Sequence, residues 1–224
     1  MRSSKILVSI PSISISTFPQ MGWIPAPFST TERTLDCFKT ELSGLSVDKL
    51  WGVNIPHFSL SEHGASGVAG PGMPHRELFF PEEIEPRLSM ICGTYDKWRP
   101  YPAEKLTPYA IQMAVKFARK RCKLFKHIAE NMDWDVLFYV EHSPSSLAHL
   151  DNEVAGLIAK EVMESVVKVS EQWPSVPIVI FSPYGTGDDG GFIVSNLQGQ
   201  EANGDWDWIR RYLNGSDSAS SGTE

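Results

Sequence analysis

The chain has 224 residues, of which 42% are hydrophobic and 21% charged, a composition typical of a globular protein that buries a substantial core. Its formal net charge of −7 argues against a general nucleic-acid or anionic-membrane binder, because phosphate groups are held by clustered lysine and arginine. Three cysteines without CxxC spacing, no leader pattern and no apolar run of membrane-spanning length lead us to expect a cytoplasmic protein with reduced thiols.

The first part of the chain predicts two strands, a helix and a long loop. Lys5–Ile10 is an apolar run that predicts a buried strand, and Pro11 ends it. A short helix is expected from Thr30 to Leu42, because a threonine suits a helix start. Another short strand is predicted over 50–55. Residues 57–75 are rich in glycine and proline and predict a loop or lid, whose three histidines fit no recognised metal-ligand spacing.

Helices are predicted through the middle of the chain. Pro81 and two glutamates mark the start of a short helix over 79–90. The longest helix is expected over 108–132, with an apolar stripe on one side. Its segment 116–126 carries six positive charges in eleven residues. These charges can be interpreted in two ways. They form either a surface that binds an acidic partner or a polyphosphate, or a solvated helix face with acidic neighbours.

The last part of the chain repeats the strand-and-helix pattern. Val136–Val140 predicts a buried strand that ends in a polar loop, and an amphipathic helix is expected over 150–173. Val176–Phe181 predicts a further strand, which runs into a glycine-rich loop over 182–191. Smaller elements are expected at 192–194, a strand, and at 205–213, a helix.

Strands that are apolar throughout and alternate with helices predict an α/β fold, with a mainly parallel sheet covered on both faces. We expect residues 5–10, 136–140 and 177–181 to lie side by side in that sheet. Ligands bind outside the carboxyl ends of such strands, so chemistry is expected at that edge. The predicted organisation is one domain over 1–214, with a loop-rich insertion at about 53–107, and a disordered tail over 215–224.

Four segments carry a distinctive order of features. The first strand ends at Pro11, and Thr34 precedes Gly44 by ten residues. The strand VLFYV is followed by Ser145 and His149, spaced as in Asp-x-x-x-His with serine in the first place, and the last strand ends in Ser-Pro-Tyr-Gly. In this order the chain resembles the alkaline phosphatase superfamily, and within it the type I phosphodiesterase and nucleotide pyrophosphatase branch, over about residues 5–200.

The resemblance implies a three-layer α/β/α, alkaline-phosphatase-like domain, with Thr34 as a nucleophile and His149 as a metal ligand. Other ligand positions of the family fall on Pro11, Ser145, Pro183 and Tyr184, a poor set for divalent cations. Both retained residues have plainer readings. The Thr34 hydroxyl suits a helix start, and His149 suits a hydrogen bond to the preceding loop.

Other residues expected at the same edge are candidates for a site. The candidate replacement metal ligands are Glu141, His142, Asp188 and Asp189. Gly185 and Gly187 are candidates for binding phosphate through backbone amides. The plainer reading is that the loop acids are only solvated.

Two functions remain open from the sequence. The first is a catalytically degraded relative that keeps the α/β/α scaffold as a binding or assembly module, with a nucleotide or another small phosphoester as the candidate ligand, which it does not cleave, and with no cofactor. The second is an active phosphodiesterase that depends on zinc or manganese, in which Thr34 attacks phosphorus and His149 helps to hold the metal. Neither a membrane nor a specific nucleic acid is expected as a partner.

Overall fold

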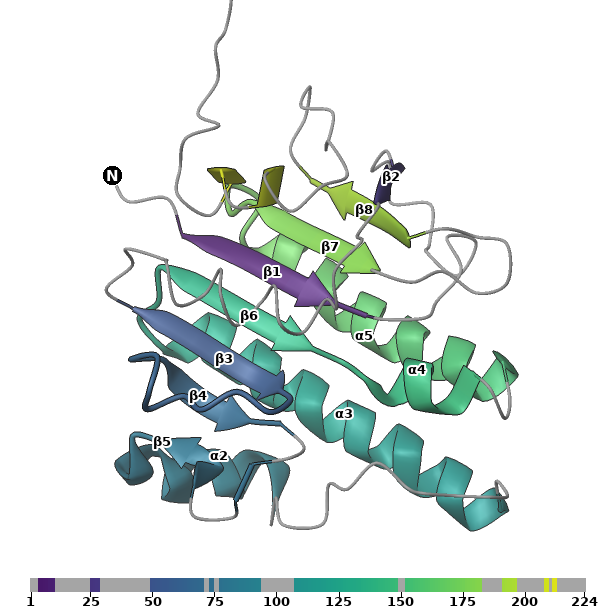
Figure 1. The fold of residues 1–224 in the computed structure, drawn as a ribbon, viewed down its shortest axis with the longest axis horizontal. Helices are drawn as coiled ribbons and strands as arrows, with labels where there is room; N and C mark the ends of the chain where they lie inside the picture. The colour runs from purple at the N-terminus through teal and green to yellow at the C-terminus, as the bar shows by residue number, and fades with distance from the viewer. Residues whose placement is uncertain are drawn as a thin grey trace, which may run out of the picture.

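The computed structural model describes residues 4–10, 25–28, 49–70, 73–74, 77–93, 107–148, 152–182, 191–196, 208–209 and 211–212. They form one mixed eight-stranded sheet in the order β2-β8-β7-β1-β6-β3-β4-β5 (Figure 1). The strands are β1 (Lys5–Ser9), β2 (Pro25–Phe28), β3 (Leu50–Ile55), β4 (Ser66–Ala69), β5 (Phe79–Phe80), β6 (Val136–Val140), β7 (Ile178–Ser182) and β8 (Gly191–Ser195). The helices are η3 (Glu82–Ile84), α2 (Glu85–Cys92), α3 (Pro108–Asn131), α4 (Ser143–Ala148) and α5 (Asn152–Gln172).

The five inner strands of the sheet, from β7 to β4, run parallel to one another. The prediction that the three apolar runs lie side by side is confirmed, because β1 pairs with β6 on one side and with β7 on the other. Ser9 lies opposite Val140 in β6 and opposite Phe181 in β7. The carboxyl ends of these three strands therefore meet at one edge. The outer strands β5 and β8 pair antiparallel with their neighbours, so the sheet is mixed.

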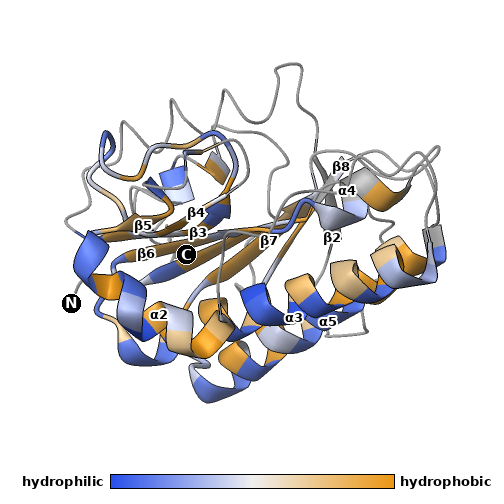
Figure 2. Ribbon diagram, turned by 90° about the horizontal axis from the view of Figure 1, so that it is seen from below, coloured by the Kyte–Doolittle hydropathy of each residue, from blue (hydrophilic) through white to orange (hydrophobic). Residues whose placement is uncertain are grey.

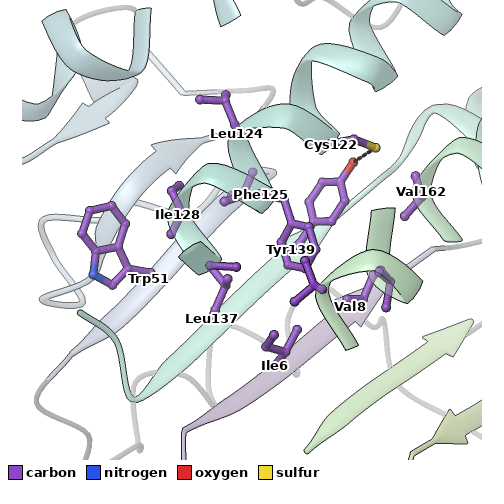
Figure 3. Close-up of a cluster of buried hydrophobic side chains, with 14 of the residues drawn as sticks. Ile6, Val8, Trp51, Cys122, Leu124, Phe125, Ile128, Leu137, Tyr139 and Val162 are labelled. Carbon is purple, nitrogen blue, oxygen red and sulfur yellow. Dashed lines mark hydrogen bonds between the residues drawn. The ribbon is translucent and has the colours of Figure 1, made fainter. Parts of the chain in front are cut away.

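Both faces of the sheet are buried, which explains why its inner strands are apolar throughout. On one face lie α2, α3 and α5 (Figure 2). Ile6 and Val8 of β1 and Tyr139 of β6 point to this helical face, where they meet Phe125 and Ile128 of α3 (Figure 3). The alternate residues of the same strands, including Leu7 and Phe138, point to the opposite face.

The opposite face is covered in the described part of the chain by a loop and a short helical segment. Phe58 and Leu60, in the loop between β3 and β4, pack on this face. So do Trp208, Ile209 and Tyr212. The helix predicted over 205–213 is confirmed at 208–209 and 211–212. The Tyr212 hydroxyl donates a hydrogen bond to the Pro177 carbonyl oxygen at 2.9 Å.

The connections after β3 and after β6 leave the sheet on opposite faces. From β3 the chain crosses to β4 through the loop that packs with Phe58. From β6 it runs the other way, through α4 and α5, to β7. Right-handed crossovers that travel in opposite directions must lie on opposite faces. The carboxyl ends of β3 and β6 therefore form a topological switch point, the place where ligands bind in open α/β sheets.

The prediction of an unbroken loop over 57–75 is wrong, because β4 occupies 66–69 and is an inner strand. Its glycine, which is rare inside strands, hides the strand pattern in the sequence. Gly67 has a φ of +131°, and a Cβ there would lie 2.0 Å from the carbonyl oxygen of Gly52 in β3. Glycine is needed where two backbones approach this closely. Among the described residues of the segment 53–107, β4 and β5 belong to the sheet and α2 to its helical cover, and the predicted domain organisation stays a prediction.

Two other local predictions need correction. The first two residues of the helix expected over 79–90 form the strand β5, which pairs with β4. The helical part begins only with η3 and continues into α2. The polar loop expected after β6 contains the helix α4 instead. The long helices α3 and α5 are confirmed close to their predicted bounds, as are the strands β3 and β8. The helix predicted at 30–42 lies outside the described residues, as does the tail.

Candidate ligand site at the carboxyl edge of the sheet

Two of the predicted site residues, Glu141 and His142, lie in the described part of the chain and follow β6 directly. Thr34, His149, Gly185, Gly187, Asp188 and Asp189 all lie outside the described residues. The expected convergence of Thr34 and His149 therefore stays a prediction. The backbone of Ser145 lies in α4.

The edge is held together by backbone hydrogen bonds that continue beyond the strands. The amide of Ile10 donates to the Phe181 carbonyl oxygen at 3.0 Å, and the amide of Glu141 donates to the Ser9 carbonyl oxygen at 2.9 Å. Ser9 and Ser182, the last residues of β1 and β7, are buried. The positions of Glu141 and His142 are thus fixed by the sheet itself.

Glu141 is completely buried and forms an ion pair with Arg121 of α3, which is 5% exposed. Arg121 Nε donates to Oε2 at 2.6 Å and Nη2 to Oε1 at 2.7 Å. The Tyr139 hydroxyl also donates to Oε2 at 3.0 Å, and the Ser143 amide to Oε1 at 3.0 Å. A carboxylate has about four acceptor positions, so both oxygens of Glu141 are fully used.

The charge of Arg121 keeps Glu141 ionised. Burial by itself would raise the pKa of this carboxyl, but the Arg121 charge, together with hydrogen bonds from Arg121 and Ser143, lowers the pKa below its usual value. A metal at Glu141 would therefore have to displace a buried arginine. Within the described structure, Glu141 acts as the internal counter-ion of Arg121.

The segment 116–126 suggested that Arg121 belongs to an exposed basic face, but its side chain is buried. Two further residues of that segment have acidic neighbours. Arg119 Nε donates to Glu161 of α5 at 2.8 Å, and Lys126 lies 3.4 Å from Glu130. These contacts favour the solvated-face reading, although binding of an acidic partner remains untested.

Within the described part of the chain, His142 carries a buried polar atom that lacks a hydrogen-bond partner. Its Nε2 is buried and has no hydrogen bond. Burial lowers the pKa of this imidazole to about 4, with nearby Glu141 opposing the shift and the neighbouring Arg121 and His57 adding to it. His142 is therefore neutral at neutral pH, and its Nε2 donates or accepts according to the tautomer.

The end of β3 lies beside this imidazole and has an unusual backbone. Asn54 and His57 have φ angles of +61° and +53°, in the left-handed region that non-glycine residues rarely adopt. The buried Asn54 donates from Nδ2 to the Val140 carbonyl oxygen at 2.7 Å, which joins the ends of β3 and β6. Strained residues of this kind cluster at binding and catalytic sites. His57 is exposed, within electrostatic reach of His142.

A metal centre is not assembled from the described residues alone. Among them no three or more histidine, cysteine, aspartate or glutamate side chains gather closely enough to hold an ion. Asp188, Asp189 and His149 fall outside that search, so zinc or manganese binding stays a prediction. Within the same described residues, no helix has both the length and the apolar character needed to span a membrane.

Comparison with known proteins adds no family to these observations. No family model matches the chain, and no match was found among curated proteins or solved structures. Function therefore has to be argued from the site and from the motif order in the sequence.

Proposed function

We propose that this protein is a catalytically degraded relative of the type I phosphodiesterases, which binds a nucleotide or another small phosphoester at the carboxyl edge of its sheet and does not cleave it. The observation that carries the proposal is the complete engagement of Glu141 by Arg121, Tyr139 and Ser143. Glu141 is the carboxylate that follows β6, and its negative charge is already neutralised inside the fold.

The arrangement of strands supports the family part of the proposal. The resemblance assigns ligand-bearing motifs to the ends of three strands, and those strands are β1, β6 and β7, which are adjacent and parallel. Their carboxyl ends meet at the edge where an α/β protein binds ligands. The proposed fold is the three-layer, alkaline-phosphatase-like arrangement, for which the mixed sheet and one helical layer provide support.

The chemistry of phosphoryl transfer supports the non-catalytic part. Such enzymes stabilise the charge of the transferred group with divalent cations, which require carboxylate and imidazole ligands. In this chain the inherited ligand positions hold proline, serine and tyrosine, and the acid beside them is paired with arginine. Without a cation, Thr34 would be an unactivated alcohol.

Binding and turnover measured on the same preparation test the proposal. Calorimetric titration with adenosine monophosphate should show binding, whereas hydrolysis of a generic phosphodiester should be equal in the wild type and in Thr34→Ala. Metal analysis of the purified chain should find no stoichiometric zinc or manganese. Co-purification of metal, together with loss of hydrolysis in Thr34→Ala, would establish the active phosphodiesterase instead.

A further inference from the structure

We infer that His142 holds the bound phosphoester, by donating a hydrogen bond from Nε2 to a phosphate oxygen at the switch point between β3 and β6, with His57 as the second contact. This inference rests on the proposed function and assigns its binding residues. It uses residues that the motif resemblance does not employ.

The first reason is the condition of His142 Nε2. A buried polar atom without a hydrogen bond destabilises a fold, so its presence calls for an explanation. Phosphate oxygens of an ester accept hydrogen bonds and do not donate them. A ligand at this atom therefore requires the tautomer with its proton on Nε2, and binding supplies the missing partner.

The second reason is the place of His142 in the fold. His127 Nε2 and Trp173 Nε1 are also buried without hydrogen bonds. His127 lies in the last turns of α3, which leads into β6, and Trp173 directly follows α5, which leads into β7. Both therefore lie toward the amino ends of the strands. His142 lies at the carboxyl edge, beside a switch point, where α/β proteins bind their ligands.

The third reason is charge. The ionisable groups that act on His142 are Glu141, Arg121 and His57. Arg121 and Glu141 cancel each other as a buried pair, which leaves two imidazoles and no uncommitted carboxylate among these groups. A cation placed here would find no uncommitted negative charge among these groups, because Glu141 is already paired with Arg121. An anion is favoured, because a neutral imidazole can donate a hydrogen bond to it and no uncommitted carboxylate among these groups repels it.

The fourth reason is the backbone of the neighbouring strand. The left-handed conformations of Asn54 and His57 turn the chain at the end of β3, and the Asn54 hydrogen bond to Val140 ties that end to β6. Phe58, the next residue, is buried in the sheet core and stacks on His63. The backbone that presents His57 is thus anchored on both sides.

The inference is tested by titrating four proteins with inorganic phosphate and with adenosine monophosphate. His142→Leu removes the donor, and His142→Gln keeps an amide N–H at a similar reach. His127→Leu is the matched control, since it removes another imidazole whose Nε2 is buried without a hydrogen bond. Long-range proton–nitrogen spectra of the histidine rings, recorded on the wild type with and without ligand, identify the tautomer and the nitrogen that is contacted.

We expect His142→Leu to weaken binding by about tenfold or more, because hydrogen bonds to charged groups are the strong ones. His142→Gln should recover part of the loss, and His127→Leu should bind like the wild type. The Nε2 signal of His142 should shift on binding.

Equal binding by wild type and His142→Leu, or an unmoved Nε2 signal at saturation, overturns the assignment and leaves phosphoester binding intact. Absence of any binding by the wild type refutes the proposed function and this inference together. Should His142→Leu fail to fold, His142→Gln and the ring spectra still decide the question.

Discussion

Replacement of Arg121 by methionine would leave Glu141 buried beside an aliphatic side chain of similar length. Glu141 would lose two of its four hydrogen bonds and its counter-ion. Hydrogen bonds to charged groups contribute about 1.5–3 kcal/mol each, which gives a loss of about 3–6 kcal/mol for the two. Breaking a buried ion pair from one side typically costs about 3–5 kcal/mol. We therefore expect the free energy of unfolding to fall by about 3–5 kcal/mol.

The double replacement Arg121→Met with Glu141→Leu separates the pair from its surroundings. Removing both charges eliminates the uncompensated carboxylate, so the double variant should regain most of the loss. Urea unfolding followed by circular dichroism at pH 7 measures each free energy. Arg119→Met, on the exposed side of the same helix, is the control and should change the midpoint little. A single variant as stable as wild type, or a double variant no better than the single, would refute the reasoning.

The pH dependence of the same variants has a definite sign. In the wild type the pKa of Glu141 is lower in the folded state than in the unfolded state. Its contribution to stability is therefore present above the unfolded pKa and lost as pH falls through the folded pKa. Without Arg121, burial should raise the folded pKa above the unfolded value. The penalty in Arg121→Met should then grow as pH rises above the unfolded pKa, opposite to the wild-type trend.

Two further predictions concern backbone packing and thiol reactivity. Gly67→Ala should lower the free energy of unfolding by about 1–3 kcal/mol or more, because a Cβ there meets the Gly52 carbonyl oxygen. Gly64→Ala is the control: it has open space around it and should cost only about 1–2 kcal/mol for its positive φ. Equal losses in urea unfolding would contradict this prediction. Burial raises the pKa of both Cys92 and Cys122 to about 11. In a Cys37→Ser background, neither thiol should therefore react with a disulfide reagent at pH 8 until the protein unfolds. Rapid labelling of the native chain would show that the two thiols are not buried.

Strong local patterns explain which parts of the fold were predictable. Val136–Val140 is apolar at every position because β6 lies between two other strands, β1 and β3, and is buried on both faces of the sheet. The helix α3 was found from its apolar stripe in the same way. The strand β4 gave no such pattern, since Ser66–Ala69 is only four residues long and contains a glycine and two other small residues. Its identity as a strand depends on a close contact with β3, which is a tertiary property.

The candidate site was predictable in position and only partly in content. Glu141 and His142 follow an apolar strand, so the general rule for α/β sheets located them. The ion pair between Glu141 and Arg121 is not evident from composition, because Arg121 lies among the other basic residues of the segment 116–126. Helical spacing contained the signal. Arg121 follows Ala118 by three residues and precedes Phe125 by four, which places it on the buried stripe.

The central position of β1 has a consequence for the order in which the fold can assemble during synthesis. This strand is made first, yet its neighbours are β6 and β7, and Ile6 pairs with Leu137 and Ile178. Chains are synthesised at about 5–20 residues per second, so β1 waits on the order of ten seconds for its second partner. During that interval β3 and β4 can pair locally. β1 is thus enclosed only after both of its neighbours have been made, and its apolar residues stay exposed until then.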